Sequence, residues 1–307
     1  MNDARARLRY LDQTLDLLFP GPGDPSPYTL LPHRLLPRRL VPRAWWHPGR
    51  RVTVPSGRDG IESHLSEVFG TPVRVTLRVR PARRANRKPI LEARAADGPI
   101  AFVKIGDTDL TRELVAHEAR TLALLAGVPL KTVVPPAVLH HGSWRGLSVL
   151  ALTPLPVRRG RIPADVLTDA IAEIARVPGD AARGTEGQGF SWHGDLTPWN
   201  ISRGPDGRLL VWDWERFGTG VPLGLDAVHH FFQRALRRDD PATAARACVA
   251  RSLRILAPFG LSAAEARLTA LHYLIALAGR HAADGHAPLG PPELWLTPLA
   301  DSQETLL

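Results

Sequence analysis

The chain has 307 residues, 44% of them hydrophobic and 22% charged, with a net charge of +9. This composition is ordinary for a globular protein of one large domain or two lobes. No apolar stretch reaches membrane-spanning length, and no secretory signal is recognisable. Because the single cysteine, Cys248, also excludes an internal disulfide, we expect a cytoplasmic protein. The excess positive charge lies entirely in residues 1–155, without the interleaved aromatic residues of a nucleic-acid-binding module, so we expect no nucleic-acid partner and no membrane partner.

Residues 1–60 are expected to form an N-terminal extension. Leucines recur at helical spacing over residues 3–19, and Pro20-Gly21-Pro22-Gly23 ends that helix. Prolines then recur up to about Pro48 at a density that blocks helix and central strand, so residues 20–48 should be extended. We interpret this segment as a strap on the main domain; a docking site for a partner or substrate is the alternative.

Residues 61–155 are expected to form a small, strand-rich lobe. A short helix over 61–69 precedes an alternating strand at 73–79, and Asp97-Gly98 predicts a hairpin between strands 89–95 and 100–105. A helix over about 110–126 and a strand over 147–152 complete this lobe.

Residues 156–307 are expected to form a larger, mainly helical lobe. Helices are predicted at 163–177, 224–238, 242–256 and 263–283. The chain should pass between the lobes near Thr153-Pro154-Leu155-Pro156. The predicted fold class is therefore α+β, with a small antiparallel sheet before a helical lobe.

The segment His193-Gly194-Asp195-Leu196-Thr197-Pro198-Trp199-Asn200 carries the most specific signal in the chain. Its spacing H-x-D-x-x-x-x-N is that of a kinase catalytic loop, in which the aspartate receives a hydroxyl proton and the asparagine reaches a metal. We therefore predict Asp195 as the catalytic residue. His193 is more simply explained as a structural residue that hydrogen-bonds the backbone than as a general base.

A second carboxylate, Asp213, follows the apolar strand Leu209-Leu210-Val211-Trp212. A Pro205-Asp206-Gly207 turn should close a hairpin that brings Asn200 close to Asp213, and we predict that both bind Mg²⁺. Glu215, two residues further along, is a candidate either for a second metal position or for a position that supports the metal ligands without touching the metal. The His140-His141 and His229-His230 pairs lack zinc-ligand spacing, so no transition-metal site is expected.

Lys104 is one of only three lysines and lies in an apolar strand. We predict that it contacts the nucleotide phosphates and pairs with Glu118, with Glu113 as the competing partner. The loop 81–88 should cover the phosphates, yet it contains no glycine. Either its Arg83, Arg84 and Arg87 stabilise phosphate or the loop is simply solvated.

These motifs resemble the aminoglycoside phosphotransferase family of the protein-kinase-like superfamily. The resemblance rests on His193-Gly194-Asp195-Leu196-Thr197-Pro198-Trp199-Asn200-Ile201 and Val211-Trp212-Asp213-Trp214-Glu215, and more loosely on Phe102-Val103-Lys104 and Glu118. Asp226 resembles the family's later structural aspartate. The resemblance covers roughly residues 70–285, and residues 1–60 have no counterpart in the family's common core. It implies a two-lobed kinase fold, with ATP (or GTP) and Mg²⁺ as cofactors. Residues 61–155 would then be the nucleotide-binding lobe, and residues 156–307 the lobe for catalysis and substrate binding.

The expected activity is phosphoryl transfer to a hydroxyl of a natural product, antibiotic or sugar-like small molecule. A peptide Ser/Thr acceptor and a catalytically inactive binding module are the alternatives. Because residues 156–307 contain 16 Arg against 17 Asp+Glu, we expect a neutral or cationic acceptor rather than a strongly anionic one. The oligomeric state stays open.

Overall fold

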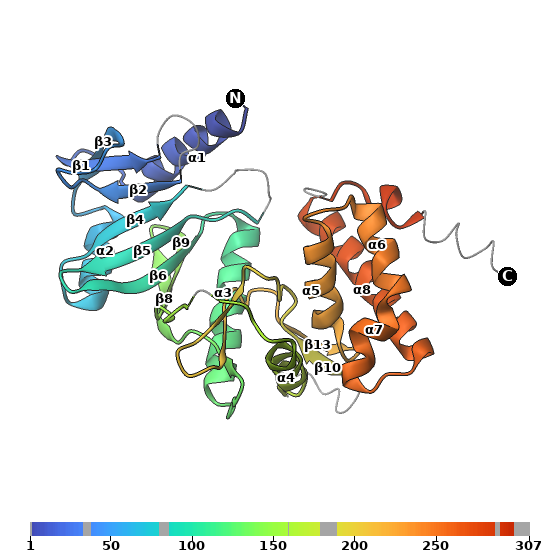
Figure 1. Ribbon diagram of the computed structural model, residues 1–307. Helices are drawn as coiled ribbons and strands as arrows, with labels where there is room; N and C mark the ends of the chain where they lie inside the picture. Colours follow the sequence, from blue (N-terminus) through green and yellow to red (C-terminus); the bar gives the residue numbers. More distant parts are fainter. Residues whose placement is uncertain are drawn as a thin grey trace. The chain divides into compact units, whose positions relative to one another are not determined.

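The computed structural model describes residues 2–32, 38–79, 86–158, 160–178, 189–285 and 289–297. The chain divides into two compact units: residues 1–116 with 138–154, and residues 117–137 with 155–307 (Figure 1). The predicted α+β class is confirmed, since the first unit is built on an antiparallel sheet and the second is mainly helical. Among the described residues, no helix combines the length and the apolar character that crossing a membrane requires.

The first unit is organised around one antiparallel sheet of eight strands, in the order β3-β1-β2-β4-β5-β6-β9-β8. Its strands are β1 (Asp24–Leu31), β2 (Arg39–Pro42), β3 (Arg50–Ser56), β4 (Arg74–Arg78), β5 (Ile90–Ala95), β6 (Gly98–Gly106), β8 (Val138–Trp144) and β9 (Leu147–Leu152). Its helices are α1 (Asn2–Leu18), α2 (Ile61–Phe69) and the start of α3 (Asp109–Ala126). The strands predicted at 73–79, 89–95, 100–105 and 147–152 are all present.

The expectation that prolines keep residues 20–48 out of a central strand is wrong. Strand β1 pairs with both β2 and β3, and β2 continues the sheet to β4 through Leu40 and Leu77. Strand β1 pairs with β2 only from Tyr28 onward, so Pro25 has no partner strand on that side. The Pro27 carbonyl still accepts the N–H of Arg43 at 3.0 Å, just beyond the end of β2. Leu36 and Pro37 lie outside the described residues.

One hydrophobic core joins this N-terminal extension to the strands that follow it. Buried side chains from α1, β1 and β2 pack in the same cluster as those from β4, β6 and β9, for example Leu18, Tyr28, Leu40, Val75, Val103 and Val149. Residues 24–31 and 39–42 are therefore integral to the sheet rather than a strap laid upon it. The proposed boundaries at residues 60 and 155 remain proposals; the compact units divide within α3 and after Pro154.

The second unit contains five helices beyond the end of α3, within the described ranges, and short strands that carry the loops described below. The helices are α4 (Ala164–Ala175), α5 (Leu225–Ala235), α6 (Pro241–Ala250), α7 (Ser252–Leu256) and α8 (Ala263–Asp284), with single turns at η2 (Ala257–Phe259) and η3 (Pro292–Leu294). The strands are β7 (Val133–Val134), β10 (Phe190–Trp192), β11 (Ile201–Arg203), β12 (Leu209–Val211) and β13 (Gly218–Val221).

The helices of the second unit enclose a separate core. Phe232 of α5 packs edge-on against Tyr273 of α8, with ring centroids 5.8 Å apart, and both side chains are fully buried. A capping box between Ser262 and Glu265 starts α8. The single helix predicted over 242–256 is divided into α6 and α7 at Arg251, which leaves helical geometry at φ −107° and ψ 9°.

Candidate active site

The predicted catalytic loop connects β10 to β11 and turns sharply at Gly194. This residue has φ +78°, and a Cβ atom there would lie 2.1 Å from the carbonyl oxygen of Arg216. Only glycine fits both the left-handed conformation and the close backbone approach. The loop then closes on itself, because the Thr197 N–H donates to the Asp195 carbonyl (2.8 Å) and the Asn200 N–H donates to the Thr197 carbonyl (3.1 Å).

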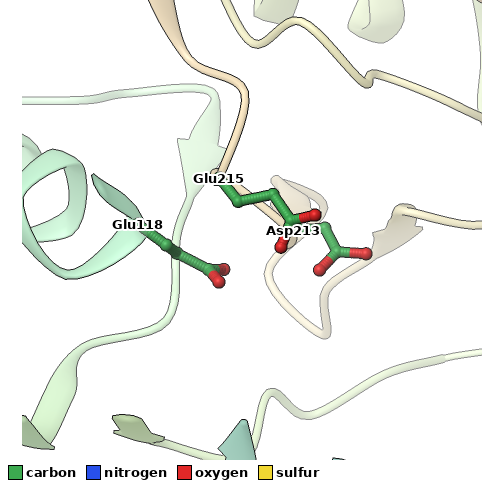
Figure 2. Close-up of side chains that lie close together, drawn as sticks. All are labelled: Glu118, Asp213 and Glu215. Carbon is green, nitrogen blue, oxygen red and sulfur yellow. The ribbon is translucent and has the colours of Figure 1, made fainter. Parts of the chain in front are cut away.

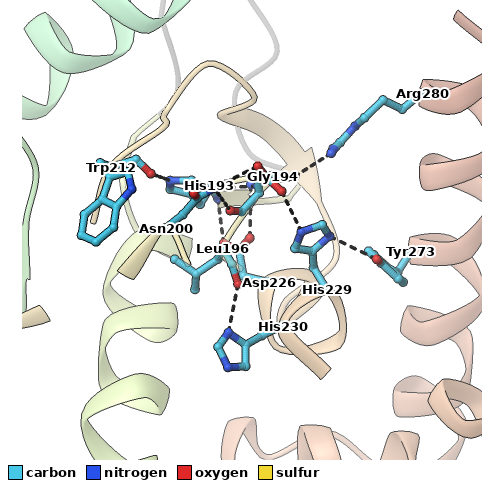
Figure 3. Close-up of polar contacts among 11 residues, drawn as sticks. His193, Gly194, Leu196, Asn200, Trp212, Asp226, His229, His230, Tyr273 and Arg280 are labelled. Atoms are coloured by element: carbon cyan, nitrogen blue, oxygen red, sulfur yellow. Dashed lines mark hydrogen bonds and ion pairs between the residues drawn. The ribbon is translucent and has the colours of Figure 1, made fainter. Parts of the chain in front are cut away.

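A buried carboxylate holds the start of this loop (Figure 3). Asp226, at the first turn of α5, accepts the N–H of His193 at 2.7 Å and that of Gly194 at 3.2 Å. Burial raises the pKa of Asp226 to about 7, against the opposing effect of the two N–H donors. Arg280 of α8 donates to the Gly194 carbonyl at 2.7 Å, and its guanidinium lies over the ring of Trp192. The loop is thus tied to two helices.

His193 is fully buried and has the backbone contacts expected of a structural residue. Its Nδ1 accepts the N–H of Asp195 at 3.1 Å, which places the proton on Nε2, 3.2 Å from the Trp212 carbonyl. Burial lowers the pKa of His193 to about 4, although the nearby carboxylates of Asp195 and Asp213 oppose that shift. The ring is therefore neutral near pH 7, and its hydrogen bond holds the loop against Trp212, the residue that follows β12.

Asp195 is held by hydrogen bonds to both of its carboxylate oxygens. Asn200 Nδ2 donates to Oδ2 at 2.9 Å and also to the Asp195 carbonyl at 3.0 Å. His229 Nε2 lies 3.1 Å from Oδ1, and His229 Nδ1 lies 3.1 Å from the hydroxyl of Tyr273. The Asp195 side chain is still 34% exposed and is therefore accessible from solvent.

His229 and Tyr273 were missed by the sequence analysis, which considered the His229-His230 pair only as zinc ligands. A helical pattern offered the missing signal: in α5, His229 shares the buried face of Leu225 and Phe232, four residues before it and three after it. A histidine in such a face needs polar partners. Burial lowers the pKa of His229, so the ring is neutral, Nε2–H donates to the Asp195 carboxylate, and Nδ1 accepts from Tyr273.

The predicted hairpin brings the backbones of Asn200 and Asp213 to the same end. Strands β11 and β12 pair with Ile201 opposite Val211, and the Trp212 N–H donates to the Asn200 carbonyl at 3.1 Å. Asp213 has φ +72°, a conformation that aspartate tolerates better than most residues. The next residue, Trp214, is fully buried and anchors the turn.

Three carboxylates gather beside this turn (Figure 2). Oxygen atoms of Glu118, Asp213 and Glu215 all lie within 4.8 Å of one another. Glu118 comes from α3, is fully buried, and accepts the N–H of Trp214 at 3.2 Å, which fixes it against the turn. An all-oxygen, anionic set of this kind fits a hard cation such as Mg²⁺, and a cation would relieve the repulsion among the three charges.

Two other predicted features lie in the first unit. Lys104 is buried in β6, opposite Ile90 of β5 and Leu150 of β9, and its pairing with Glu118 of the second unit stays a prediction. Glu113, the competing partner, is exposed, whereas Glu118 is buried.

The phosphate-binding hypothesis for the loop 81–88 also stays a prediction. Arg83 and Arg84 lie outside the described residues. Arg87 is described, and its guanidinium lies 4.9 Å from the ring centroid of Tyr10 in α1.

Several solved protein structures are similar to part of this chain. An ADP-bound aminoglycoside phosphotransferase, APH(2'')-Ib, is 11% identical, with a TM-score of 0.48 over 74% of this chain and 90% of that one. A streptomycin–ATP complex of APH(2'')-IIa is 13% identical (TM-score 0.45; 70% and 86% covered). The macrolide 2'-phosphotransferase MphH from Brachybacterium faecium is 17% identical (TM-score 0.43; 74% and 94% covered).

No protein-family model matches the chain, and no curated protein matches it either.

Proposed function

We propose that the protein is a Mg²⁺-dependent kinase that transfers the terminal phosphoryl group of ATP or GTP to a hydroxyl of a small molecule. The observation that carries this proposal is the Asp195 carboxylate, held by Asn200 and His229 yet partly exposed, on a loop whose other end adjoins Asp213. Enzymes catalyse phosphoryl transfer mostly by positioning the reactants and by electrostatic stabilisation. A base and a group of carboxylates held in fixed positions can supply both.

In this reaction the acceptor hydroxyl forms a new O–P bond as the bond from the terminal phosphorus to the bridging oxygen breaks. The products are the phosphorylated acceptor and a nucleoside diphosphate. Asp195 accepts the hydroxyl proton. His229 and Asn200 each hold one carboxylate oxygen of Asp195, so the side chain is already fixed in one orientation before the acceptor hydroxyl binds. Little side-chain entropy is therefore lost when the reacting groups come together.

Asp213, with Glu118 and Glu215 beside it, would hold Mg²⁺ on the nucleotide. The amide oxygen of Asn200 is a further candidate ligand, because its Nδ2 is already engaged by Asp195. Bound Mg²⁺ neutralises charge on the phosphate oxygens. Lys104 and Glu118 are proposed to contact the nucleotide as the sequence predicted.

Two measurements test the proposal. A thermal-shift assay with and without Mg-ATP or Mg-GTP reports nucleotide binding, because a ligand that binds only the native state raises Tm. Phosphoryl transfer is then followed as acceptor-dependent release of nucleoside diphosphate over a panel of hydroxylated antibiotics, sugars and other natural products.

Asp195→Asn is the matched variant for these assays, since asparagine keeps the shape but cannot accept the proton. We expect it to bind Mg-nucleotide normally and to lose transfer by about a thousandfold or more. Unaltered transfer by Asp195→Asn, or no nucleotide binding by the wild-type protein, would contradict the proposal.

A further inference from the structure

A groove in the second unit lies outside the catalytic constellation. It is bounded by α4, α5, α7 and η2 and has a volume of about 840 Å³, within the range of small-molecule sites. Its apolar surface comes from Leu167, Ile171, Phe231, Ile255 and Phe259. A concave apolar surface of this size has room for a drug-sized molecule.

The charged residues of this groove are almost all arginines. They come from the end of α5 and from the α6–α7 segment, and they are Arg234, Arg237, Arg238, Arg251 and Arg254, with Asp239 as the one carboxylate. In the described part of the chain, no carboxylate lies within ion-pairing distance of Arg234, Arg237, Arg238 or Arg254. Their guanidinium groups are therefore available to an anion.

A second hollow of about 500 Å³ extends the groove to the catalytic loop. It shares Ala164, Leu167, His230 and Arg234 with the first, and it adds Arg158 and Arg161 and two residues of the catalytic segment, Pro198 and Ile201. None of the described residues that line it is acidic. The arginine-lined surface thus reaches the catalytic segment at Pro198 and Ile201, while Asp195 itself lines neither hollow.

His230 joins the groove physically to the catalytic loop (Figure 3). It lines both hollows, and its Nδ1 lies 3.0 Å from the carbonyl oxygen of Leu196, the residue after Asp195. A carbonyl only accepts, so Nδ1 carries the proton and Nε2 keeps a lone pair. A molecule seated in the groove would therefore contact a side chain that holds the catalytic loop.

We propose that this groove, lined by arginines and apolar side chains, binds the anionic part of the acceptor: an apolar molecule that carries carboxylate or phosphate groups besides its reacting hydroxyl. Arginine pairs with such groups bidentately, and the apolar wall would bury the body of the molecule. The inference rests on the proposed kinase function. A neutral or cationic acceptor, the expectation from the net charge of residues 156–307, is the alternative that the experiments below distinguish.

Binding can be measured without knowing the acceptor, using a matched pair of fluorescent probes. Anilinonaphthalene sulfonate carries an anion on an apolar body, and N-phenylnaphthylamine has nearly the same body without it. The test variant is the double substitution Arg234→Gln with Arg254→Gln. The control is Arg267→Gln, an exposed arginine of α8 that lines neither hollow.

We expect the double variant to bind the sulfonate about tenfold or more weakly, and the neutral amine unchanged. Arg267→Gln should match the wild type, and Arg234→Lys with Arg254→Lys, which keeps the charge, should retain most of the affinity. Unchanged sulfonate affinity in the glutamine variant, or equal losses for both probes, would overturn the proposal.

The connection to catalysis has its own readout. For acceptors compared as a carboxylate and its amide, the double glutamine variant should raise KM for the carboxylate with little change in kcat, while Arg267→Gln leaves both unchanged. Transfer confined to cationic or neutral acceptors would refute the anionic assignment and leave the kinase function standing. Asp195→Asn should leave sulfonate binding intact, so a failure of the kinase proposal is seen separately.

Discussion

His229 Nε2 lies 3.1 Å from Oδ1 of Asp195, and the other nitrogen of the same ring lies 3.1 Å from the hydroxyl of Tyr273. The three groups come from α5, the catalytic loop and α8. Because His229 is buried and neutral, it donates one hydrogen bond to the carboxylate and accepts one from tyrosine. It positions Asp195 without competing for the proton that Asp195 receives.

Removing this hydrogen bond should lower kcat more than it raises KM. A hydrogen bond to a charged group contributes about 1.5–3 kcal/mol, so His229→Ala is expected to reduce kcat by roughly tenfold to a hundredfold. His229→Gln can still donate from Nε2 and should recover part of the loss. Tyr273→Phe, which removes only the partner hydroxyl, should have the smaller effect. Equal kcat values for His229→Ala and the wild type would show that Asp195 does not need this support.

The cluster of three carboxylates from Glu118, Asp213 and Glu215 predicts how Tm responds to Mg-ATP. Asp213→Asn removes one of the three carboxylates proposed to hold the metal, so the increase in Tm with Mg-ATP should be lost. Glu293→Gln, at an exposed position far along the chain, is the control and should respond to Mg-ATP as the wild type does. A full response by Asp213→Asn would place the metal elsewhere.

Gly194 allows a matched comparison of backbone effects. Gly194 and Gly220 have similar φ values, +78° and +75°, but a Cβ at Gly220 has no atom within 4 Å, whereas one at Gly194 meets backbone at 2.1 Å. Gly220→Ala should therefore cost only the left-handed penalty of about 1–2 kcal/mol. Gly194→Ala must also move the catalytic loop, so we expect a larger loss of stability in urea unfolding and a loss of transfer. Similar losses for both would mean that the close approach is unimportant.

Stability should fall as the protein is acidified from about pH 6.5 towards pH 4. His193 and His230 have pKa values lowered to about 4 by burial, and the pKa of His229 is lowered as well. The unfolded chain binds protons at these groups in that range while the native protein does not, so protons favour unfolding. Asp226 has a raised pKa of about 7, so its protonation in the native protein increases stability on acidification over about pH 4–7. We expect the combined effect of the three histidines to exceed that of this one carboxyl group.

Urea unfolding at several pH values measures this dependence, and each of the two histidines shifted to about 4 contributes on the order of a few kcal/mol at most. His193→Gln removes one of these groups and should make the dependence on pH shallower. A wild-type stability that is level or rises on acidification would contradict the assignment of neutral buried histidines.

Local patterns in the sequence predicted much of the fold. Alternation over 73–79 and helical spacing over 110–126 correspond to β4 and α3, because residues close in the chain determine which face of an element is buried. The prolines of β1 were misread for the same reason: a local rule excludes proline from paired strands, but only the neighbouring strand's register shows which backbone groups need a donor. Strand β8, His-Gly-rich and without clear alternation, gave no local signal.

The sequence alone predicted the candidate catalytic motif, since Asp195, Asn200 and Asp213 lie within one loop and one hairpin whose geometry is set by short-range spacing. Only the tertiary structure decided which other groups meet them. Glu118 joins Asp213 from α3, His229 reaches Asp195 from α5, and arginines from separate helices face one groove although the net charge of their lobe is close to zero. Such contacts depend on how helices pack through space, and neither composition nor local periodicity contains that information.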